Sequence, residues 1–397
     1  MNKFAVWRGP TLVVEPVNPS AFTAEQWDRF AIACGASMRS AHAHLRWLQV
    51  RLLTKGRVRT FGIYNQVDGD RRLIGHATVL FGRRGRRFYN GLNILPEFSA
   101  LWTQAMEALL ARIGPGDFEY GWSLSLEPSR DAELGAIAGI RDLQARRVDI
   151  HAVDFSQWPS WEAYHRDISE NNRRNARKVE QSSSDLRVTL HSGLAALGAA
   201  ATLTRMRTDM YRRKGLSFRP LRIFAGYLTS ILLAPPQILM ARVVADGRVL
   251  AAYNGVEFGG NHYYLDGASS SHMPTGGSYL LMAMLRRAYE RNPTGKFIMG
   301  YIVYPMTREM PEGLLRSRRA VRATDWHSSI TTFSWAHAAD QRRAEAAPDR
   351  MLADRAAPPA WLGTLAAMTG GVFWGLGVLI WRRRLDARAA ASSVEGR

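Results

Sequence analysis

Four side chains in one part of the sequence could move protons. Glu257 and Asp266 are carboxylates that can accept a proton, and Tyr253 and Tyr301 carry hydroxyls that can donate one. Such groups beside an activated carbonyl serve the transfer of a group to an amine or a hydroxyl. The alternatives are ordinary sheet packing for the tyrosines and turn chemistry for Asp266, which precedes a glycine.

A glycine turn lies between Asp266 and Tyr301. Residues 274–277 read Pro-Thr-Gly-Gly, and Ser278 opens a stretch with helical spacing. The first turn of a helix has free N–H groups and the positive end of the helix dipole, so a phosphate can dock there. Gly276 and Gly277 would let a pyrophosphate approach the backbone. The alternative is that the two glycines only turn the chain.

The elements that must position these residues follow from apolar alternation and turn residues. An Asp-Gly pair predicts a hairpin, because glycine accepts positive φ without steric cost. A second glycine turn precedes the third strand, and the helix after the Pro/Gly turn carries its apolar side chains on one face. The predicted order is strand 237–245, strand 248–258, strand 262–267, helix 278–290 and strand 296–300.

This order resembles the acyl-CoA half of a GNAT acyltransferase. The helix entered through a Pro/Gly turn after the strand YLDGAS, and the Phe-X-X-Gly strand that follows it, resemble the GNAT-related group that includes the Fem-type peptidyltransferases. They are most similar to its BioF2-like acetyltransferase branch. The resemblance implies that Gly276, Gly277 and Ser278 bind the diphosphate of acyl-CoA. It also implies that strand 248–257 offers backbone N–H groups to the acyl carbonyl.

A cationic helix predicted at 161–181 supports the same resemblance. It matches the BioF2-like pattern Tyr, Ser, (Arg/Lys)-Arg-Asn-X-Arg-(Arg/Lys), here with Tyr164, Ser169, Arg173, Arg174, Asn175, Arg177 and Lys178. The match implies that Arg173, Arg174 and Lys178 help bind a phosphate-bearing donor or an acidic acceptor. The alternative is a solvated cationic face, the usual reading of a charge run.

The first part of the chain has a similar element order. The predicted elements are a helical stretch 22–53, one helix or two if Gly35 and residues 37–40 break it, a hairpin of 58–66 with 73–81, helix 101–113 and strand 118–127. Residues 88–94 are expected to enter a loop. The predicted fold class is α/β (α+β), with two GNAT-like halves of mixed, mostly antiparallel sheet flanked by helices, plus a C-terminal transmembrane helix. We predict halves at residues 1–150 and 151–336, with a strand at 146–155 crossing between them and a terminal strand at 328–336.

The end of the sequence changes character. Residues 337–360 form a charged, Ala-rich linker, and residues 361–381 carry no charge and have the length of a membrane span, with tryptophans at both ends. A basic tail, 382–397, follows. The arginines on both sides leave the orientation open. Since the sequence shows no secretion signal, we expect a C-terminal anchor in the inner membrane with the catalytic part in the cytoplasm.

Composition limits the other possibilities. The formal charge of +19 favours polyanionic partners such as acidic lipids, nucleic acid or phosphate-bearing substrates, and the single Cys34 excludes a disulfide framework within the chain. The chain lacks the motifs GxSxG, HExxH, GxGxxG and the Walker loop. His42 and His44, two apart on a helix, point to different faces, so we predict no metal site.

The function predicted from the resemblance is an acyl-CoA-dependent N- or O-acyltransferase at the inner face of a bacterial membrane. The acceptor would be a small molecule, an amino compound or a glycan precursor of the envelope, and acyl-CoA would be a co-substrate rather than a tightly bound cofactor. One alternative is an aminoacyl-tRNA-dependent Fem-type transferase, which the charge suits although no helical arm is found. Another is a non-catalytic module that binds an anion at the membrane.

Overall fold

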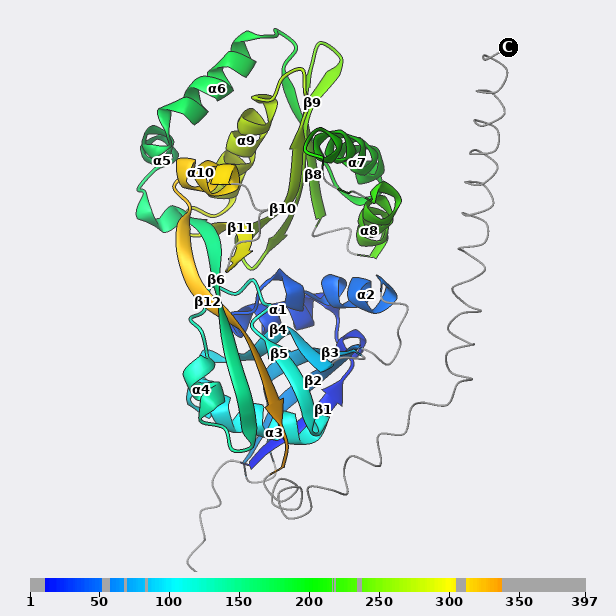
Figure 1. Ribbon diagram of the computed structural model, residues 1–397, viewed down its shortest axis with the longest axis vertical. Coiled ribbons are helices and arrows are strands. Elements are labelled where there is room, and N and C mark those ends of the chain that lie inside the picture. Colours follow the sequence, from blue (N-terminus) through cyan, green and yellow to red (C-terminus); the bar gives the residue numbers. More distant parts are fainter. Residues whose placement is uncertain are drawn as a thin grey trace, which may run out of the picture. The chain divides into compact units, whose positions relative to one another are not determined.

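The computed structural model describes residues 11–51, 58–67, 70–82, 85–215, 217, 219–233, 238–304 and 312–337 (Figure 1). They all belong to one compact unit, residues 1–337. The predicted membrane span at 361–381, with its linker and basic tail, lies outside the described residues and stays a prediction. Within the described ranges, no helix combines the length and the apolar character needed to cross a membrane.

A single twelve-stranded sheet runs through the unit. Most neighbouring strands are antiparallel, as predicted. In spatial order the strands are β1 (Thr11–Val17), β2 (Val58–Val67), β3 (Asp70–Gly82), β4 (Gly85–Ile94), β5 (Gly116–Tyr120), β12 (Thr324–Trp335), β6 (Ile140–Asp154), β11 (Lys296–Val303), β10 (Asn261–Ser269), β9 (Arg248–Phe258), β8 (Ile238–Ala245) and β7 (Arg187–His191).

The strand order reads the same way from both edges. Five strands follow one another in sequence order from either side, β1 to β5 and β7 to β11, and the shared pair β12 and β6 joins them. The two parallel neighbours, β4 with β5 and β10 with β11, hold equivalent places. The sheet thus has two equivalent halves, which the element order predicted. The predicted division at residue 150 falls inside β6, which pairs with β12 along its length and with β11 at its end.

Helices cover both faces of the second half. The helices α7 and α8 lie on one face of β8 to β10, and α9 lies on the other with α5, α6 and α10 (Figure 1). Helix α2, from the first half, packs on α8. The helices are α1 (Ala24–Ala33), α2 (His42–Arg51), α3 (Trp102–Ile113), α4 (Asp131–Gly135), α5 (Trp161–Asp167), α6 (Glu170–Gln181), α7 (Ala196–Arg213), α8 (Pro220–Leu233), α9 (Gly276–Arg291) and α10 (Glu312–Ala320).

Three predictions about elements need correction. The helix expected at 161–181 is two helices, because Ser169 caps a new one and its Oγ accepts a hydrogen bond from the Asn172 amide at 3.4 Å. Residues 88–94 do not enter a loop but belong to β4, where Phe88 is buried. The strand expected at 118–127 ends at Tyr120, and Gly121 follows with a φ of +97°.

Candidate functional site

The sheet opens between β10 and β11. The two strands pair in parallel over two residues each, ending at Tyr263 and Ile298. Beyond that point a bulge at Leu265 shifts β10 against β9, and β11 leaves its register with β6. Gly300, with a φ of +84°, allows β11 to leave its register with β6, because a residue with a Cβ would be strained in that conformation. Backbone groups on the facing edges are therefore not used by a neighbouring strand.

Helix α9 begins beside this opening with a first turn that leaves room for a ligand. Its N-cap, Thr275, makes no side-chain cap hydrogen bond. Gly276 is buried, and a Cβ there would lie 2.9 Å from Cβ of Leu250. Gly277 is half-buried, and a Cβ there would meet Ser269 of β10 at 3.4 Å. Gly276 is thus needed for close packing, whereas a side chain at Gly277 would make only ordinary contacts with Ser269.

In the first half the strands also diverge, since β4 and β5 pair over only two residues each, but aromatic side chains lie at the equivalent place. Helix α3 starts with Trp102 instead of glycine, and its Nε1 donates to the Leu92 carbonyl at 3.2 Å. The hydroxyl of Tyr120 accepts from the Leu92 amide at 3.3 Å. The space between β4 and β5 is reduced to a cavity of about 30 Å³. The second half has glycines where the first has Trp102, so its diverging strands are the candidate ligand site of the two.

Arg318 of α10 reaches the break in β11. Its guanidinium donates to the Met299 carbonyl at 2.6 Å and to the Gly300 carbonyl at 3.4 Å. The side chain is buried, and burial lowers its pKa to about 10. In the described part of the chain no carboxylate lies within salt-bridge distance of it. A buried cation without a counter-ion is costly, so the site is suited to an anion or a developing negative charge.

Asp266 lies on the opposite face of the sheet, under α7 and α8. Its Oδ1 is 2.5 Å from Nη1 of Arg207, and its Oδ2 accepts from the Tyr227 hydroxyl at 2.8 Å. Arg207 also donates to the Tyr227 oxygen at 2.9 Å. Burial raises the pKa of Asp266 above its usual value, and the nearby Arg207 offsets part of the rise. The carboxylate is therefore held in place and is more basic than an ordinary aspartate.

Asp266 borders a pocket of about 230 Å³ between the two halves of the unit. Asn254 is 6% exposed, and its Oδ1 is buried without a hydrogen-bond partner. A buried carbonyl oxygen of this kind is stabilised by an N–H or O–H donor on a ligand. The pocket lining is His44, Trp47, Arg222, Ile223, Gly226, Tyr227, Ser230, Ile238, Met240, Asn254, Val256, Leu265 and Asp266. Polar acceptors in an aliphatic surround fit a small, partly apolar amine or alcohol.

Glu257 is not brought to this site. Its carboxylate binds Arg291 at 2.7 Å and Arg287 at 3.2 Å, both in the last turns of α9. Burial opposes ionisation, but the hydrogen bond from His262 and the two arginines outweigh it and lower the pKa of Glu257. Arg287 is about 16 Å along the helix from Gly276, at about 1.5 Å per residue. The prediction that Glu257 and the glycine turn share a site is therefore wrong.

Tyr253 also lies away from the pocket. It is 2% exposed in the core under α9, and its hydroxyl is 2.5 Å from Nε2 of His262. Burial raises the pKa of this hydroxyl well above its usual value. The parent strand β9 is paired on both sides, with β8 and β10, so its backbone N–H groups are already used. The expectation that strand 248–257 supplies them is wrong, since the free edges belong to β10 and β11.

Tyr301 follows the break in β11 and points to the same face as Asp266. It is half-buried against the core that α7 and α8 form with the sheet. Its ring meets Trp122 edge-on at 5.7 Å, and the Arg39 guanidinium lies 5.9 Å from its centre. Of the four proton-transfer candidates, the structure thus places Asp266 and Tyr301 on one face.

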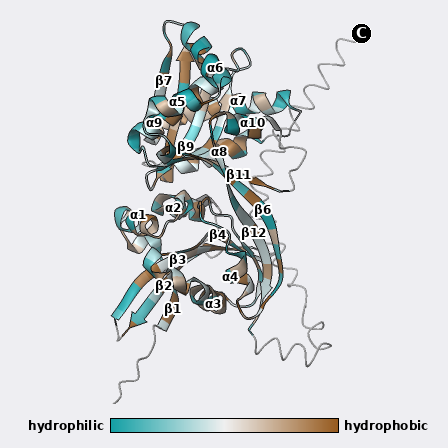
Figure 2. Cartoon of the chain, turned by 90° about the vertical axis from the view of Figure 1, so that its left-hand side faces the viewer, coloured by the Kyte–Doolittle hydropathy of each residue, from teal (hydrophilic) through white to brown (hydrophobic). Residues whose placement is uncertain are grey.

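The cationic helix α6 packs on α9. Oγ of Ser182 is 3.8 Å from Sδ of Met273, so the end of α6 flanks the glycine turn. Arg174 and Lys178 are exposed on its hydrophilic outer face, and Nε of Arg173 is buried without a partner (Figure 2). The structure therefore brings the C-terminal end of α6, where Lys178 lies, near the turn that precedes α9.

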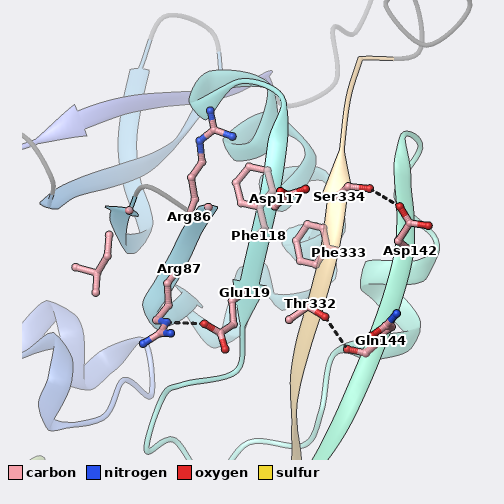
Figure 3. Close-up of a pocket in the computed structure, with 13 residues that line it drawn as sticks. Arg86, Arg87, Asp117, Phe118, Glu119, Asp142, Gln144, Thr332, Phe333 and Ser334 are labelled. Carbon is pink, nitrogen blue, oxygen red and sulfur yellow. Dashed lines mark hydrogen bonds and ion pairs between the residues drawn. The ribbon is translucent and has the colours of Figure 1, made fainter. Parts of the chain in front are cut away.

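A wider groove of about 820 Å³ lies in the first half, over β4, β5, β12 and β6 (Figure 3). Its polar side chains bind one another. Arg87 pairs with Glu119 at 2.6 Å, and the Ser334 hydroxyl donates to Asp142 at 3.0 Å. These groups are already satisfied, so the groove is a weaker candidate than the pocket at Asp266.

Comparison with known proteins agrees with this geometry. Residues 166–300 match the family model described as Acetyltransferase (GNAT) domain. The crystal structure titled FemX superposes with a TM-score of 0.60 at 13% identity, covering 84% of this chain and 99% of that one. A protein of unknown function from Bacteroides thetaiotaomicron gives 0.50 at 7% identity, covering 82% and 100%.

A tandem GNAT protein from the clavulanic acid pathway is a third similar structure, with a TM-score of 0.46 at 11% identity, covering 82% of this chain and 98% of that one. Among curated proteins, no sequence matches the chain significantly. Identities this low establish the fold and nothing more, and the family match covers the half that holds α9 and the pocket at Asp266. Residues 166–300 are therefore similar to the GNAT acetyltransferase domain, and the described part of the chain has a fold like that of the FemX structure.

Proposed function

We propose that the enzyme transfers an acyl group from acyl-CoA to a small amine or alcohol bound in the pocket at Asp266. The donor would lie on the α9 face of the sheet, with its diphosphate at Gly277 and Ser278 and the basic end of α6 beside it. Its thioester would pass into the opening between β10 and β11. There the two faces of the sheet meet, so donor and acceptor can react although they enter from opposite sides.

The difference between the two halves supports the donor site most directly. The equivalent helix start carries Trp102 in the first half, but Gly276 and Gly277 in the second. The positive end of the α9 dipole favours a phosphate there.

The acceptor side supplies the proton chemistry. Asp266 takes the proton from the amine or hydroxyl as its nitrogen or oxygen attacks the thioester carbon. A bond from that atom to the acyl carbon forms, and the carbon–sulfur bond breaks. The departing thiolate takes up a proton, for which Tyr301 is the candidate donor. The positive charge of Arg318, near the separated strands, would stabilise the negative charge that develops on the thioester carbonyl oxygen during the attack.

Titration of the full-length protein with acetyl-CoA, longer acyl-CoAs and charged tRNA tests the donor. We expect saturable binding of an acyl-CoA that is weakened when Gly277 is replaced by aspartate. Binding of charged tRNA without binding of any acyl-CoA would refute the proposed donor and favour the Fem-type alternative, which the net charge of +19 and the exposed arginines of α6 support.

We further propose that the enzyme works at the inner face of a bacterial membrane, anchored by residues 361–381. The support is the uncharged, membrane-length sequence of that segment. Protease protection of the full-length protein in inside-out vesicles tests the orientation. Digestion of the part before residue 340 is expected, and its protection would place the catalytic part on the other side.

A further inference from the structure

One face of helix α8 lines the pocket at Asp266, and the opposite face is exposed. Its inner face lines the pocket at Asp266 through Ile223, Gly226, Tyr227 and Ser230. The opposite stripe, spaced four, three and four residues apart, is aliphatic and turned outward, with Leu221, Ala225, Leu228 and Leu232. Leu221 is 84% exposed and Leu232 is 53% exposed, whereas aliphatic side chains of this size are usually buried. We call this stripe the leucine face.

Basic residues gather at the start of α8. From the end of α7 to the first turn of α8 the described residues include Arg212, Arg213, Lys214, Arg219 and Arg222, all exposed. Between Met210 and Leu233 the sequence has no acidic residue. The nearest carboxylate before it, Asp209, is 3.6 Å from Arg212. The leucine face is therefore bordered at one end by a strong positive charge.

We propose that the leucine face docks on an anionic lipid surface. Exposed aliphatic side chains on one side of a helix, flanked by arginines, match a helix that lies in the membrane interface, where the leucines enter the acyl boundary and the arginines meet lipid phosphates. The charge identifies the surface as anionic rather than zwitterionic. The membrane-length segment predicted at 361–381 would keep the enzyme within reach of such a surface.

Docking in this orientation affects the choice of acceptor. The helix that touches lipid would also form a wall of the pocket, so the pocket would lie directly above the headgroups. This consequence rests on the proposed function, and it predicts an acceptor carried by the membrane, with its amine or hydroxyl at headgroup level. The docking itself does not depend on catalysis.

The experiment uses an environment-sensitive fluorophore attached to the full-length protein through Leu232→Cys, with Glu25→Cys on the exposed side of α1 as the matched control. The native Cys34 is 2% exposed, and burial raises its pKa to about 12, so the label goes to the introduced cysteine. The proteins are placed in nanodiscs of phosphatidylcholine alone or mixed with phosphatidylglycerol. Emission and quenching by a lipid-attached spin label are measured.

In discs with phosphatidylglycerol, we expect emission at position 232 to shift to shorter wavelength and to be quenched by the spin-labelled lipid. Position 25 should show neither change. The effect should weaken in zwitterionic discs and at high salt. A label at Ala225→Cys should lose its quenching when Leu221 and Leu232 are both replaced by serine, while the melting temperature stays unchanged.

Equal quenching at positions 25 and 232 would overturn the proposal, because anchoring at 361–381 alone would explain it. A blue shift at 232 without quenching by lipid would also overturn it, since protein would then cover the leucine face. Titration of the same samples with acyl-CoA tests donor binding separately from lipid docking. Donor binding that persists without lipid contact would refute the docking and leave the proposed function standing.

Discussion

Replacing Gly277 by aspartate tests the donor site without disturbing the fold. The new Cβ would meet Ser269 at 3.4 Å, an ordinary contact, and the backbone has no positive φ at this position. Aspartate in the first turn also interacts favourably with the helix dipole, by about 0.3–1 kcal/mol, and replacing a helical glycine adds about 0.5–1 kcal/mol. The variant should therefore fold at least as stably as the natural protein.

The same carboxylate would repel a bound diphosphate. Two unit charges about 5 Å apart at an effective dielectric constant of about 20 interact by about 3 kcal/mol. Solvent screening at this half-buried position reduces the repulsion to about 1.5–3 kcal/mol, which corresponds to a dissociation constant roughly 10- to 100-fold higher. Gly277→Asn, nearly the same size but neutral, should change the dissociation constant by less than about threefold, because the Coulomb penalty is absent.

Calorimetric titration with acetyl-CoA or the best acyl-CoA gives both constants, and thermal unfolding confirms the fold. Equal affinities of the aspartate and asparagine variants would refute the reasoning, since no charge would then lie near residue 277. Gly276 is unsuitable for this test. A Cβ there would lie 2.9 Å from Leu250, so lost binding could reflect a damaged helix.

The remaining predictions concern other parts of the site. Asp266→Asn should lower kcat by about 10²- to 10⁴-fold, whereas Glu257→Gln should leave it nearly unchanged; equal losses in both variants would contradict the placement of the base. Since burial raises the pKa of Asp266, kcat should fall with decreasing pH at a higher pH than for a free aspartate, and a pH profile without that fall would contradict its role. Arg318→Lys should lower kcat by about tenfold or more with little change in donor affinity, since lysine cannot hold two carbonyls as arginine does; stopped-flow turnover and titration separate the two effects. Trp102→Ala should cost about 3–5 kcal/mol of unfolding free energy without weakening donor binding, and a loss of binding would place the donor in the first half.

Much of the second half could be predicted from its sequence. Strand 248–258 and strand 296–300 have the predicted starts, and the helix after the Pro/Gly turn begins two residues earlier than expected. Alternation and turn residues are local signals, so they identify local elements well. Residues 88–94 were misassigned because an apolar run without alternation does not distinguish a buried strand from a loop.

The site itself was harder to predict, because side chains meet through tertiary contacts. The sequence identified Asp266, Tyr301 and the glycine turn as candidates, but could not show that Glu257 is paired with Arg291 at the far end of α9. Arg207, which orients Asp266, is far away in sequence and belongs to no motif. Arg318 lies in a run of arginines, Arg316, Arg318 and Arg319, and nothing in the sequence shows that it alone is buried at the break in β11.

The place of β12 affects how the protein can be made. This strand is the last of the described elements, yet it is inserted between β5 and β6, where Phe333 stacks on Phe118 at 5.4 Å. During synthesis the place of β12 between β5 and β6 therefore stays empty until more than two hundred residues after β5 have left the ribosome. A chain that ends before β12 would leave an edge of the five-residue β5 and an edge of the fifteen-residue β6 unpaired, and it would aggregate rather than yield a working half.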